Sequence, residues 1–300
     1  MMNDREPAST TRNTIAVIIP SLNSPIIDSV VSAVLLQKDV SDTFEIIVVG
    51  KDAARLIPED TRVRFVDTGQ PVPASQARNR GLEATEASLL VFLDSDCLPQ
   101  PTWLCEHVAA HKMGHRVVSG SVIPDGHNFW HLTYNLTLFH EILSTNRPGP
   151  RDFLATLNLS VDRSVIEAVG PMNSDINRVE DIDWTTRMRR HGITPYFWPY
   201  AAIYHNHNRT NLVRVWKDCA LSGYHMRRLR LEHDDLLQAP VLLRYRRLVL
   251  LLSPMIAAWA TGRILWRRPT ILRRFWKTAP ALYLTKIAWC WGASRSSEPA

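Results

Sequence analysis

Two carboxylates separated by one residue, Asp94 and Asp96, directly follow the apolar run Ser88–Leu93. Acids at positions i and i+2 of a loop can face one cation. The Mg²⁺ or Mn²⁺ of a nucleotide diphosphate is held by one or two carboxylates together with phosphate oxygens. Most isolated Asp-x-Asp pairs are solvated loop acids, whereas a position at the end of a buried strand favours function. We therefore expect Asp94 and Asp96 to bind a divalent metal that carries a phosphorylated ligand.

The N-terminal third of the chain alternates between strand-like and helix-like patterns. Short apolar runs rich in branched residues predict strands at Ile15–Pro20, Phe44–Val49, Val63–Asp67 and Ser88–Leu93. Helical patterns are present at Ile26–Leu36 and Ala74–Ala87. Strands that alternate with helices predict an α/β domain with a mostly parallel, Rossmann-like sheet flanked by helices.

Polar loops follow three of these strands. In such sheets ligands bind beyond the carboxyl ends of the strands. The loops Pro20–Asn23, Gly50–Asp52 and Asp94–Asp96 all lie at such ends, so we expect them to converge on one crevice. The candidate ligand contacts in these loops are Pro20, Ser21, Asn23, Asp52, Asp94 and Ser95.

The pattern becomes less regular after Asp96. Helices are predicted at Pro101–Lys112, Val161–Val169 and Glu180–Arg190. Strands are predicted at Val117–Val122 and Tyr196–Tyr204, the second of which runs into His205-Asn206-His207.

The last third of the chain is basic and rich in tryptophan. Two apolar stretches, Leu248–Gly262 and Ala279–Trp291, are shorter than the ~20 residues of a spanning helix. Arginines surround them: Arg227, Arg228, Arg230, Arg244, Arg246, Arg247, Arg263, Arg267, Arg268, Arg273 and Arg274. Tryptophans accompany them: Trp259, Trp266, Trp276, Trp289 and Trp291.

This combination of basic flanks and interfacial tryptophans is typical of helices that lie on an anionic membrane surface. We expect peripheral or shallow insertion at the cytoplasmic face, with a transmembrane span conceivable within 248–266. Core helices with a solvated basic face are the other interpretation. No recognised nucleic-acid motif accompanies the charge, so nucleic acid is not an expected partner.

Bulk properties are those of an ordinary globular protein of 300 residues, with 45% hydrophobic residues and a net charge of +6. The four cysteines form no Cys-x-x-Cys pair, which argues against a zinc site or a disulfide framework. The polar segment Met1–Asn13 has no apolar core of a signal peptide.

Six motifs, in order, resemble the family 2 glycosyltransferases of the GT-A fold between Thr14 and His207. The quoted segments are Ile15–Asn23, Glu45–Asp52, Ala77–Leu82 (an ARN-x-G-L helix), Leu93–Asp96, Val179–Trp184 (an ED-x-D helix start) and Ala201–His205. This resemblance implies a nucleotide-sugar-binding and catalytic domain over 14–212 and a helical, membrane-associated extension over 213–300.

The resemblance also implies roles for individual residues. Asp96 is the expected direct metal ligand, Asp94 is expected to bind ribose or metal, and His205 or His207 is a candidate third ligand, with His205 at the family position. The ion would be Mn²⁺ or Mg²⁺ and the donor a UDP- or GDP-sugar. Electrostatic stabilisation of the leaving diphosphate would then come from the metal and nearby cations.

Acceptor activation is assigned in the same way. Asp181 is the expected general base, with Glu180 beside it, because the acceptor hydroxyl must lose a proton. One base without an enzyme nucleophile implies inversion at the anomeric carbon. Arg78 is expected to reach the donor, Asp52 to bind the base, and Asn158 to line the acceptor side.

The sequence also departs from the family pattern. Gly50-Lys51-Asp52 replaces the usual acids and glycine-serine after the second strand, and no QxxRW motif follows Glu180–Arg190. The second departure favours a single-addition enzyme of cell-surface polysaccharide or glycolipid synthesis, with a glycan or lipid-linked acceptor. Two alternatives are a GT-A-like nucleotidyltransferase, which Pro20–Asn23 disfavours because it lacks glycine, and a non-catalytic membrane-bound scaffold.

Overall fold

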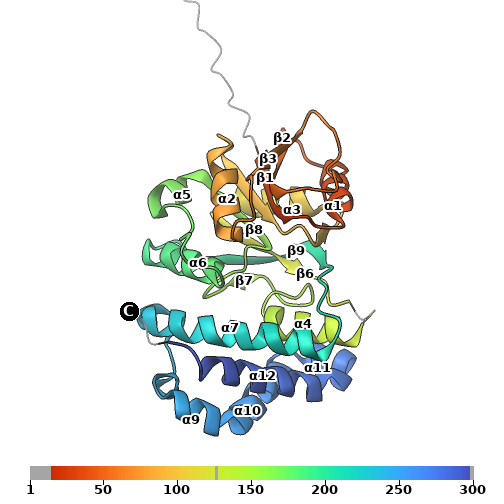
Figure 1. Cartoon of the computed structure of the whole chain (residues 1–300). Coiled ribbons are helices and arrows are strands. Elements are labelled where there is room, and N and C mark those ends of the chain that lie inside the picture. Colours follow the sequence, from red (N-terminus) through yellow and green to blue (C-terminus); the bar gives the residue numbers. More distant parts are fainter. Residues whose placement is uncertain (1–14, 126–127, 298–300) are drawn as a thin grey trace, which may run out of the picture.

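A computed structural model describes residues 15–125 and 128–297. The segment Met1–Asn13, whose polarity argued against a signal peptide, lies outside the described residues. Figure 1 shows two layers, a sheet flanked by helices in the upper part and a set of C-terminal helices packed beneath it. The expected α/β fold with a C-terminal helical extension is confirmed.

Within the described residues the strands form one nine-stranded sheet in the order β3-β2-β1-β4-β8-β6-β9-β5, with β7 paired to β9. The strands are β1 (Ile15–Leu22), β2 (Phe44–Lys51), β3 (Val63–Asp67), β4 (Leu89–Leu93), β5 (Cys97–Pro99), β6 (Val117–Val122), β7 (Gly149–Pro150), β8 (Asn158–Asp162) and β9 (Tyr196–His205). Strands β1 to β4 are parallel, as predicted.

The other half of the sheet is mixed. Strand β8 runs antiparallel to both β4 and β6, and β6 runs parallel to β9. Strands β4, β6 and β9 therefore all point the same way, so their carboxyl ends share one edge. This topology brings His205, the last residue of β9, to the edge that Asp94 occupies after β4.

The predicted helix Val161–Val169 is only partly correct. Its first two residues belong to β8, and helix α5 covers Arg163–Val169. The alternation in Asn158–Asp162 is short, and pairing with two neighbouring strands decides its conformation.

The helices that flank the sheet are α1 (Ile27–Leu35), α2 (Ala74–Glu83), α3 (Trp103–Lys112), α5 and α6 (Glu180–Arg190), and α4 (Phe129–Phe139) lies with the C-terminal helices (Figure 1). Helix α2 packs closely on the sheet at Gly81, where an added Cβ would lie 2.4 Å from Ile18 Cγ2. The glycine of the ARN-x-G-L motif thus allows α2 to sit near β1, and this contact sets the position of Arg78.

The C-terminal extension consists of α7 (Leu212–Glu232), α8 (Asp234–Leu237), α9 (Arg246–Leu251), α10 (Ser253–Arg267), α11 (Pro269–Phe275) and α12 (Ala279–Ala293), with 3₁₀ turns at Val241–Arg244 and Trp276–Thr278. Helices α7 and α12 cross closely at two glycines, Gly223 and Gly292. An added Cβ would lie 2.0 Å from Trp289 O at Gly223 and 1.7 Å from Ala220 O at Gly292, so neither position has room for a side chain.

The span that the sequence allowed within 248–266 is wrong. Among the described residues, no helix is both long and apolar enough to cross a bilayer. The apolar stretch is divided between α9 and α10, which begins with Pro254 in its first turn. The 15 residues of α10 would extend only about 22 Å, below the ~30 Å hydrocarbon thickness.

Candidate active site

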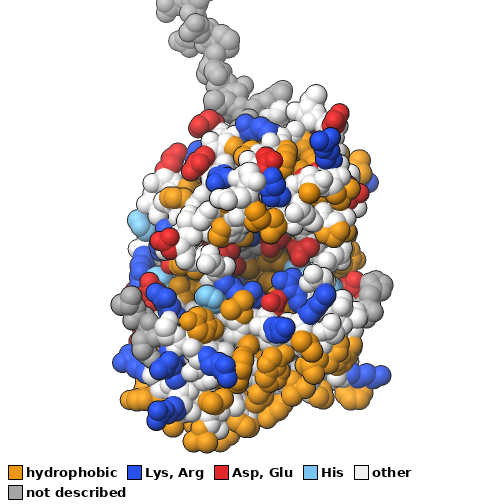
Figure 2. Space-filling view, in the orientation of Figure 1, with side chains coloured by type: hydrophobic (Ala, Val, Ile, Leu, Met, Phe, Trp, Pro, Cys, Tyr) orange, Lys and Arg blue, Asp and Glu red, His pale blue; other side chains and the backbone are white. Residues whose placement is uncertain are grey.

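Charged side chains from separate segments meet at the carboxyl edge of the sheet. Asp94 and Asp96 follow β4, His205 ends β9, and Glu180 and Asp181 begin α6. Figure 2 shows a hollow between the sheet layer and the C-terminal helices, with acidic side chains inside it and basic side chains along its lower rim. Strand ends and a helix start thus place acids and cations around one depression.

Arg78 joins two of these acids. Its Nη2 lies 2.6 Å from Asp94 Oδ1 and its Nη1 lies 2.9 Å from Glu180 Oε1, while only 4% of its side chain is exposed. Both ends of the guanidinium are therefore already paired. Arg78 thus fixes Asp94 and Glu180 relative to each other, and its expected contact with the donor stays a prediction.

Helix α6 is anchored to β4 by Trp184. The indole packs edge-on against Phe92, with ring centroids 5.6 Å apart, and its Nε1 donates to Gly170 O. Phe92 stands two residues before Asp94, so this contact links the start of α6 to the Asp-x-Asp loop. The residue before α6, Val179, has φ +63°, which is strained for a β-branched residue and indicates a constrained helix start.

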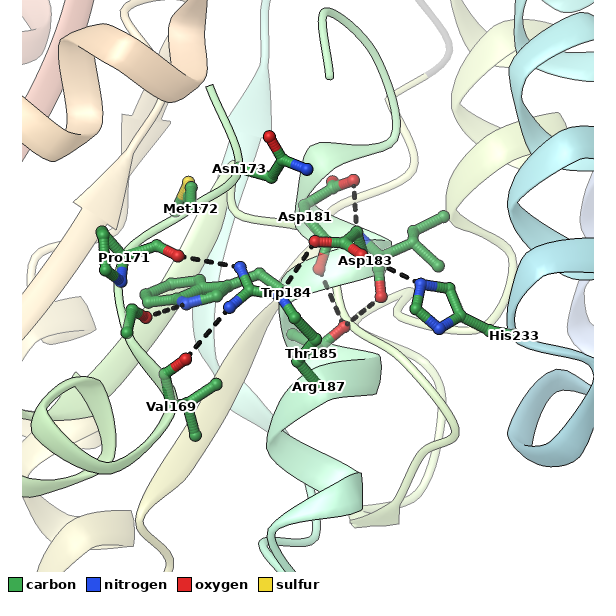
Figure 3. A network of polar contacts seen from close by, with 12 residues as sticks. Val169, Pro171, Met172, Asn173, Asp181, Asp183, Trp184, Thr185, Arg187 and His233 are labelled. Carbon is green, nitrogen blue, oxygen red and sulfur yellow. Dashed lines mark hydrogen bonds and ion pairs between the residues drawn. The ribbon is translucent and has the colours of Figure 1, made fainter. Parts of the chain in front are cut away.

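Asp183 fixes the same helix from its other side, as Figure 3 shows. Its Oδ1 lies 2.9 Å from His233 Nε2 and its Oδ2 lies 3.0 Å from Arg187 Nε. Arg187 also donates to Val169 O and Pro171 O. The third acid of the ED-x-D motif thus has a structural role, connecting α6 to the C-terminal extension at His233.

We expect Asp183→Ala to lower the free energy of unfolding by about 3 kcal/mol, because it leaves the buried His233 without this partner and removes the only carboxylate that contacts Arg187 within the described residues. Urea denaturation followed by circular dichroism measures this loss. Asp183→Asn, which keeps acceptor capacity, should lose less. Burial raises the pKa of Asp183, but the hydrogen bonds and charges of His233 and Arg187 lower it below its usual value. The contribution of Asp183 to the stability of the fold is therefore lost as the pH falls through that pKa. Equal losses in the two variants would contradict this assignment.

Asp181 lies in an environment that disfavours its charge. Burial and the neighbouring Glu180 raise its pKa, Arg78 and the Ile182 N–H lower it, and Asp94 raises it, with a resulting pKa of about 7. A carboxylate with a pKa near neutrality is suited to accept a proton at the working pH. Asp181, the expected base, is therefore close to Asp94, and both carboxyl groups interact with Arg78.

Asp96 and His205 form the candidate metal centre. Asp96 Oδ2 lies 3.6 Å from His205 Nε2, and together with Cys97 these residues could hold one ion. Carboxylate and imidazole suit Mn²⁺ or a similar ion. Burial and the Asp96 and Asp94 charges raise the pKa of the Cys97 thiol well above its usual value, so it stays protonated and is a poor ligand. The donor set thus fits Mn²⁺ at Asp96 and His205.

The orientation of His205 supports this fit. Its Nδ1 lies 2.9 Å from Asn135 Oδ1, an arrangement in which Nδ1–H donates to the amide oxygen and Nε2 is the ring nitrogen that faces Asp96. Burial raises the pKa of Asp96, but the hydrogen bond and charge of His205 and the charge of Arg209 bring it to about 2, so Asp96 is ionised.

His207, the alternative third ligand, has a different environment. Its ring stacks on His131 at 4.1 Å, and its Nδ1 accepts the Arg209 N–H. Burial and the neighbouring His205 and His131 lower its pKa to about 2, so it stays neutral. It packs behind His205, and of the two histidines only His205 belongs to the group that could hold an ion.

Of two arginines that the motifs did not identify, Arg209 reaches Asp96 and Arg178 contacts Asp218, the partner of Arg209. Arg209 Nη1 lies 3.9 Å from Asp96 Oδ2, and its Nε donates to Asp218 Oδ2 at 2.6 Å. Arg178 Nη1 lies 3.8 Å from Asp218 Oδ1 and its Nη2 donates to Ser222 Oγ. Both contact α7, which enters the site only through tertiary packing. In the sequence, only their positions could have pointed to these arginines, because Arg178 precedes the ED-x-D motif and Arg209 follows His205.

The first two loops are connected to each other. Strand β1 continues to Leu22, so Pro20 and Ser21 are strand residues and not loop residues as predicted. Asn23 Oδ1 accepts the Ala53 N–H, which ties this loop to Asp52. Backbone pairing of β1 with β2 through Leu22 and Lys51 accounts for the longer strand.

Asp52 remains a candidate for base recognition. Its carboxylate accepts the N–H groups of Leu56 and Ile57, and it borders a cavity of about 820 Å³ together with Arg55 and Phe65. Ser95, the central residue of the metal motif, accepts the Ser24 hydroxyl through its carbonyl at 2.7 Å. This bond joins the Asp-x-Asp loop to the loop after β1.

The expectation that Asn158 lines the acceptor side is wrong. Its side chain is fully buried, accepts from Trp103 Nε1, contacts His107 Nε2, and donates to Ser121 O and Ala201 O. These bonds satisfy the amide inside the sheet layer. Asn158 thus holds β6, β8 and β9 together and does not face a ligand.

Comparisons with known proteins show the family of the chain. The sequence model described as glycosyl transferase family 2 matches residues 16–170. The protein Glycosyltransferase AglE of Haloferax volcanii is 29% identical over 185 residues, which are 58% of this chain and 60% of that relative. The alignment thus spans less than two thirds of that relative's length.

Solved structures share the fold. The mannosyltransferase PcManGT from Pyrobaculum calidifontis, in complex with GDP-Man and Mn²⁺, superposes with a TM-score of 0.61 at 17% identity, over 95% of this chain and 88% of that one. GalNAc-T7 with UDP, GalNAc and Mn²⁺ superposes with a TM-score of 0.53 at 12% identity, over 77% and 52%. At such identities the likeness establishes the GT-A-type architecture.

Proposed function

Because the chain belongs to glycosyl transferase family 2, we propose that it moves a sugar from a nucleotide-diphosphate donor to an acceptor hydroxyl with inversion of the anomeric carbon. One observation carries the proposal. Arg78 bridges Asp94 and Glu180, and Asp181, whose pKa is about 7, directly follows Glu180. The carboxyl group of Asp181 is therefore close to the loop that contains Asp96. A proton acceptor and a metal-binding acid thus flank the same site.

The proposed reaction is a single displacement. Asp181 accepts the proton of the acceptor hydroxyl while that oxygen bonds to the anomeric carbon. The bond from this carbon to the diphosphate breaks, and its electron pair leaves with the nucleoside diphosphate. Arg209 stands 3.9 Å from Asp96 and is placed to offset part of the developing negative charge.

The structural relatives solved with GDP-Man or UDP and with Mn²⁺ support a UDP- or GDP-sugar as the donor and Mn²⁺ or Mg²⁺ as the ion. Asp96 and His205 would hold the ion, which would supply electrostatic stabilisation to the leaving diphosphate. Asp52 and its adjoining cavity are the proposed contact for the nucleotide base.

We expect UDP or GDP with Mn²⁺ to raise the melting temperature of the protein and Asp96→Ala to abolish this shift, because binding stabilises only the folded state. Differential scanning fluorimetry measures both. Asp125→Ala, outside the proposed ligand set, is the matched control and should keep the shift. An unchanged shift in Asp96→Ala would remove Asp96 from the metal site. Hydrolysis of a panel of nucleotide sugars then identifies the donor.

The C-terminal extension supports a membrane location. Large apolar side chains are exposed on α9, α10 and the turn that follows α11; we call Leu251, Met255, Trp259, Trp266 and Trp276 the apolar surface. Figure 2 shows hydrophobic side chains gathered over the lower part of this face, where these helices lie, with basic side chains at the margins. Exposed apolar patches with a basic rim mark membrane or protein contacts.

We propose that the apolar surface rests on the cytoplasmic face of an anionic membrane and that the acceptor is a lipid-linked or surface glycan, as in cell-surface polysaccharide or glycolipid synthesis. The Arg263 guanidinium lies 5.2 Å from the ring centroid of the exposed Trp259, and Lys277 Nζ lies 6.0 Å from that of the exposed Trp276, an arrangement that favours headgroup contact.

Flotation with phosphatidylglycerol vesicles tests this location. Replacing Trp259 and Trp266 by Ser should reduce the bound fraction by at least about tenfold per residue, since burying a large apolar side chain is worth ~1.5–3 kcal/mol. The matched control replaces Leu36 and Met113, which are exposed on the sheet layer, by Ser. Equal flotation of the two double variants would exclude the apolar surface as the contact.

A further inference from the structure

A second cavity lies apart from the candidate active site, where the catalytic layer meets the C-terminal helices. Its volume is about 910 Å³, within the range of small-molecule sites. The segment 141–152, helix α6 and the junction of α10 with α11 line it. Five arginines face it, Arg147, Arg151, Arg189, Arg267 and Arg268, against two acids, Glu141 and Asp152.

The cavity is separate from the metal and base positions. Arg189 follows Asp181 by eight residues on α6, which corresponds to a rise of about 12 Å along the helix. On the sheet side, β7 beside the cavity pairs with Tyr196 and Phe197, at the opposite end of β9 from His205. A ligand here would therefore not occupy the site of glycosyl transfer.

Three of the arginines build the walls of the cavity. Arg151 donates to four backbone carbonyls, those of Glu141, Gly149, Pro150 and Arg147, and its guanidinium lies over the Phe197 ring. Arg268 is paired with Glu141, and Arg189 with Asp152. The two acids are thus used by wall arginines, and substituting these arginines would disturb the fold.

Arg147 and Arg267 are different. Both are exposed, and within residues 15–125 and 128–297 neither has an ion-pair partner. They face the cavity from its two sides, the loop of the catalytic layer and the end of α10. Their charge, together with Arg151, leaves the cavity with three more guanidinium groups than carboxylates. Guanidinium forks bind phosphate oxygens in bidentate fashion.

We propose that this arginine cavity binds a phosphate group, with Arg147 and Arg267 as its free donors and Thr270 as a neutral one. The chemistry fits a phosphate from either of two sources, a soluble anion or the headgroup of a membrane lipid. Trp266, 87% exposed and part of the apolar surface, immediately precedes Arg267, so the cavity adjoins the proposed membrane contact. The phosphate site itself does not depend on glycosyl transfer.

The test compares two double variants of equal charge. Arg147→Gln/Arg267→Gln removes the free donors, and Arg273→Gln/Arg274→Gln removes two exposed arginines of α11 that do not line the cavity. Inorganic phosphate is titrated by calorimetry into the full chain with a chelator present, which silences metal-dependent binding. Phosphatidylglycerol vesicles, with phosphatidylcholine vesicles for comparison, are the second probe.

Each lost hydrogen bond to a charged group weakens binding by about tenfold or more, so the cavity variant should bind phosphate at least about tenfold more weakly than the control variant does. If inorganic phosphate shows this loss of affinity, a soluble anion is sufficient to occupy the site. A loss seen only with phosphatidylglycerol vesicles assigns the site to a lipid headgroup. If the two double variants match each other with both probes, the phosphate site does not exist. Melting curves confirm that both variants are folded.

Discussion

Asp181→Asn is expected to lower kcat by about 10²–10⁴-fold, the usual contribution of a general base. The amide keeps the size of the side chain but cannot accept the proton of the acceptor hydroxyl. Nucleotide binding should persist, because the proposed ion and diphosphate contacts lie at Asp96, His205 and Arg209. Transfer assays together with the melting shift caused by nucleotide and Mn²⁺ separate the two effects.

The pH dependence adds a second readout. The pKa of Asp181 is about 7, so the base is protonated and inactive in acid, and kcat/KM should rise with pH and level off above neutrality. Burial, Glu180 and Asp94 keep this pKa high, and Arg78 opposes them. In Asp181→Asn this rise should disappear from the residual activity.

Stability should change in the opposite sense. A carboxyl whose folded pKa exceeds its unfolded value favours the fold when protonated, and this contribution is lost as the pH rises through about 7. Asp181→Asn removes the buried charge, so the variant should unfold at a higher temperature than wild type at pH 8, with a smaller difference at pH 5. Asp175→Asn, in the exposed loop before α6, is the control and should change neither activity nor stability. Activity above a tenth of wild type in Asp181→Asn would place the base elsewhere.

The motif positions were predictable because they depend on local sequence. An apolar run followed at once by acids predicts a buried strand with carboxylates at its end. This pattern was enough to place Asp94 and Asp96 at the edge of the sheet. The ED-x-D start of α6 and the end of β9 at His205 are local in the same sense. Their meeting at one edge follows from the direction of the strands, which the resemblance supplied and the sheet confirms.

The features that the sequence did not reveal depend on long-range contacts. The role of Arg78 depends on Glu180, 102 residues later, and Asn158 is satisfied by groups from three other segments. Strand β8 exists because β4 and β6 lie on either side of it. No periodicity reports such partners, since a short apolar run is compatible with either strand or helix until its neighbours are known. Arg209 was not predicted as a site residue for the same reason, because its partner Asp218 lies on α7.

Arg78→Met is expected to be the most damaging substitution for stability. Asp94 and Glu180 would lose the buried cation that lies within 3 Å of both, and these partly buried carboxylates would face one another and Asp181. Removing one partner of a buried ion pair costs about 3–5 kcal/mol. Urea denaturation should detect a loss of this size, and Arg80→Met, an exposed arginine on the same helix, should lose far less.

The loss in Arg78→Met should also depend on pH in a direction that a packing defect would not produce. Without the guanidinium, the pKa values of Asp94 and Asp181 rise further, so in mildly acidic buffer these two acids protonate and the repulsion fades. The difference between Arg78→Met and wild type should therefore be smaller at pH 5 than at pH 8. Because Arg78 lowers the pKa of Asp181, the residual activity of the variant should need a higher pH than wild type to reach its plateau. A loss of stability that is equal at both pH values would mean that Arg78 acts by filling space, and that charge neutralisation does not hold the site together.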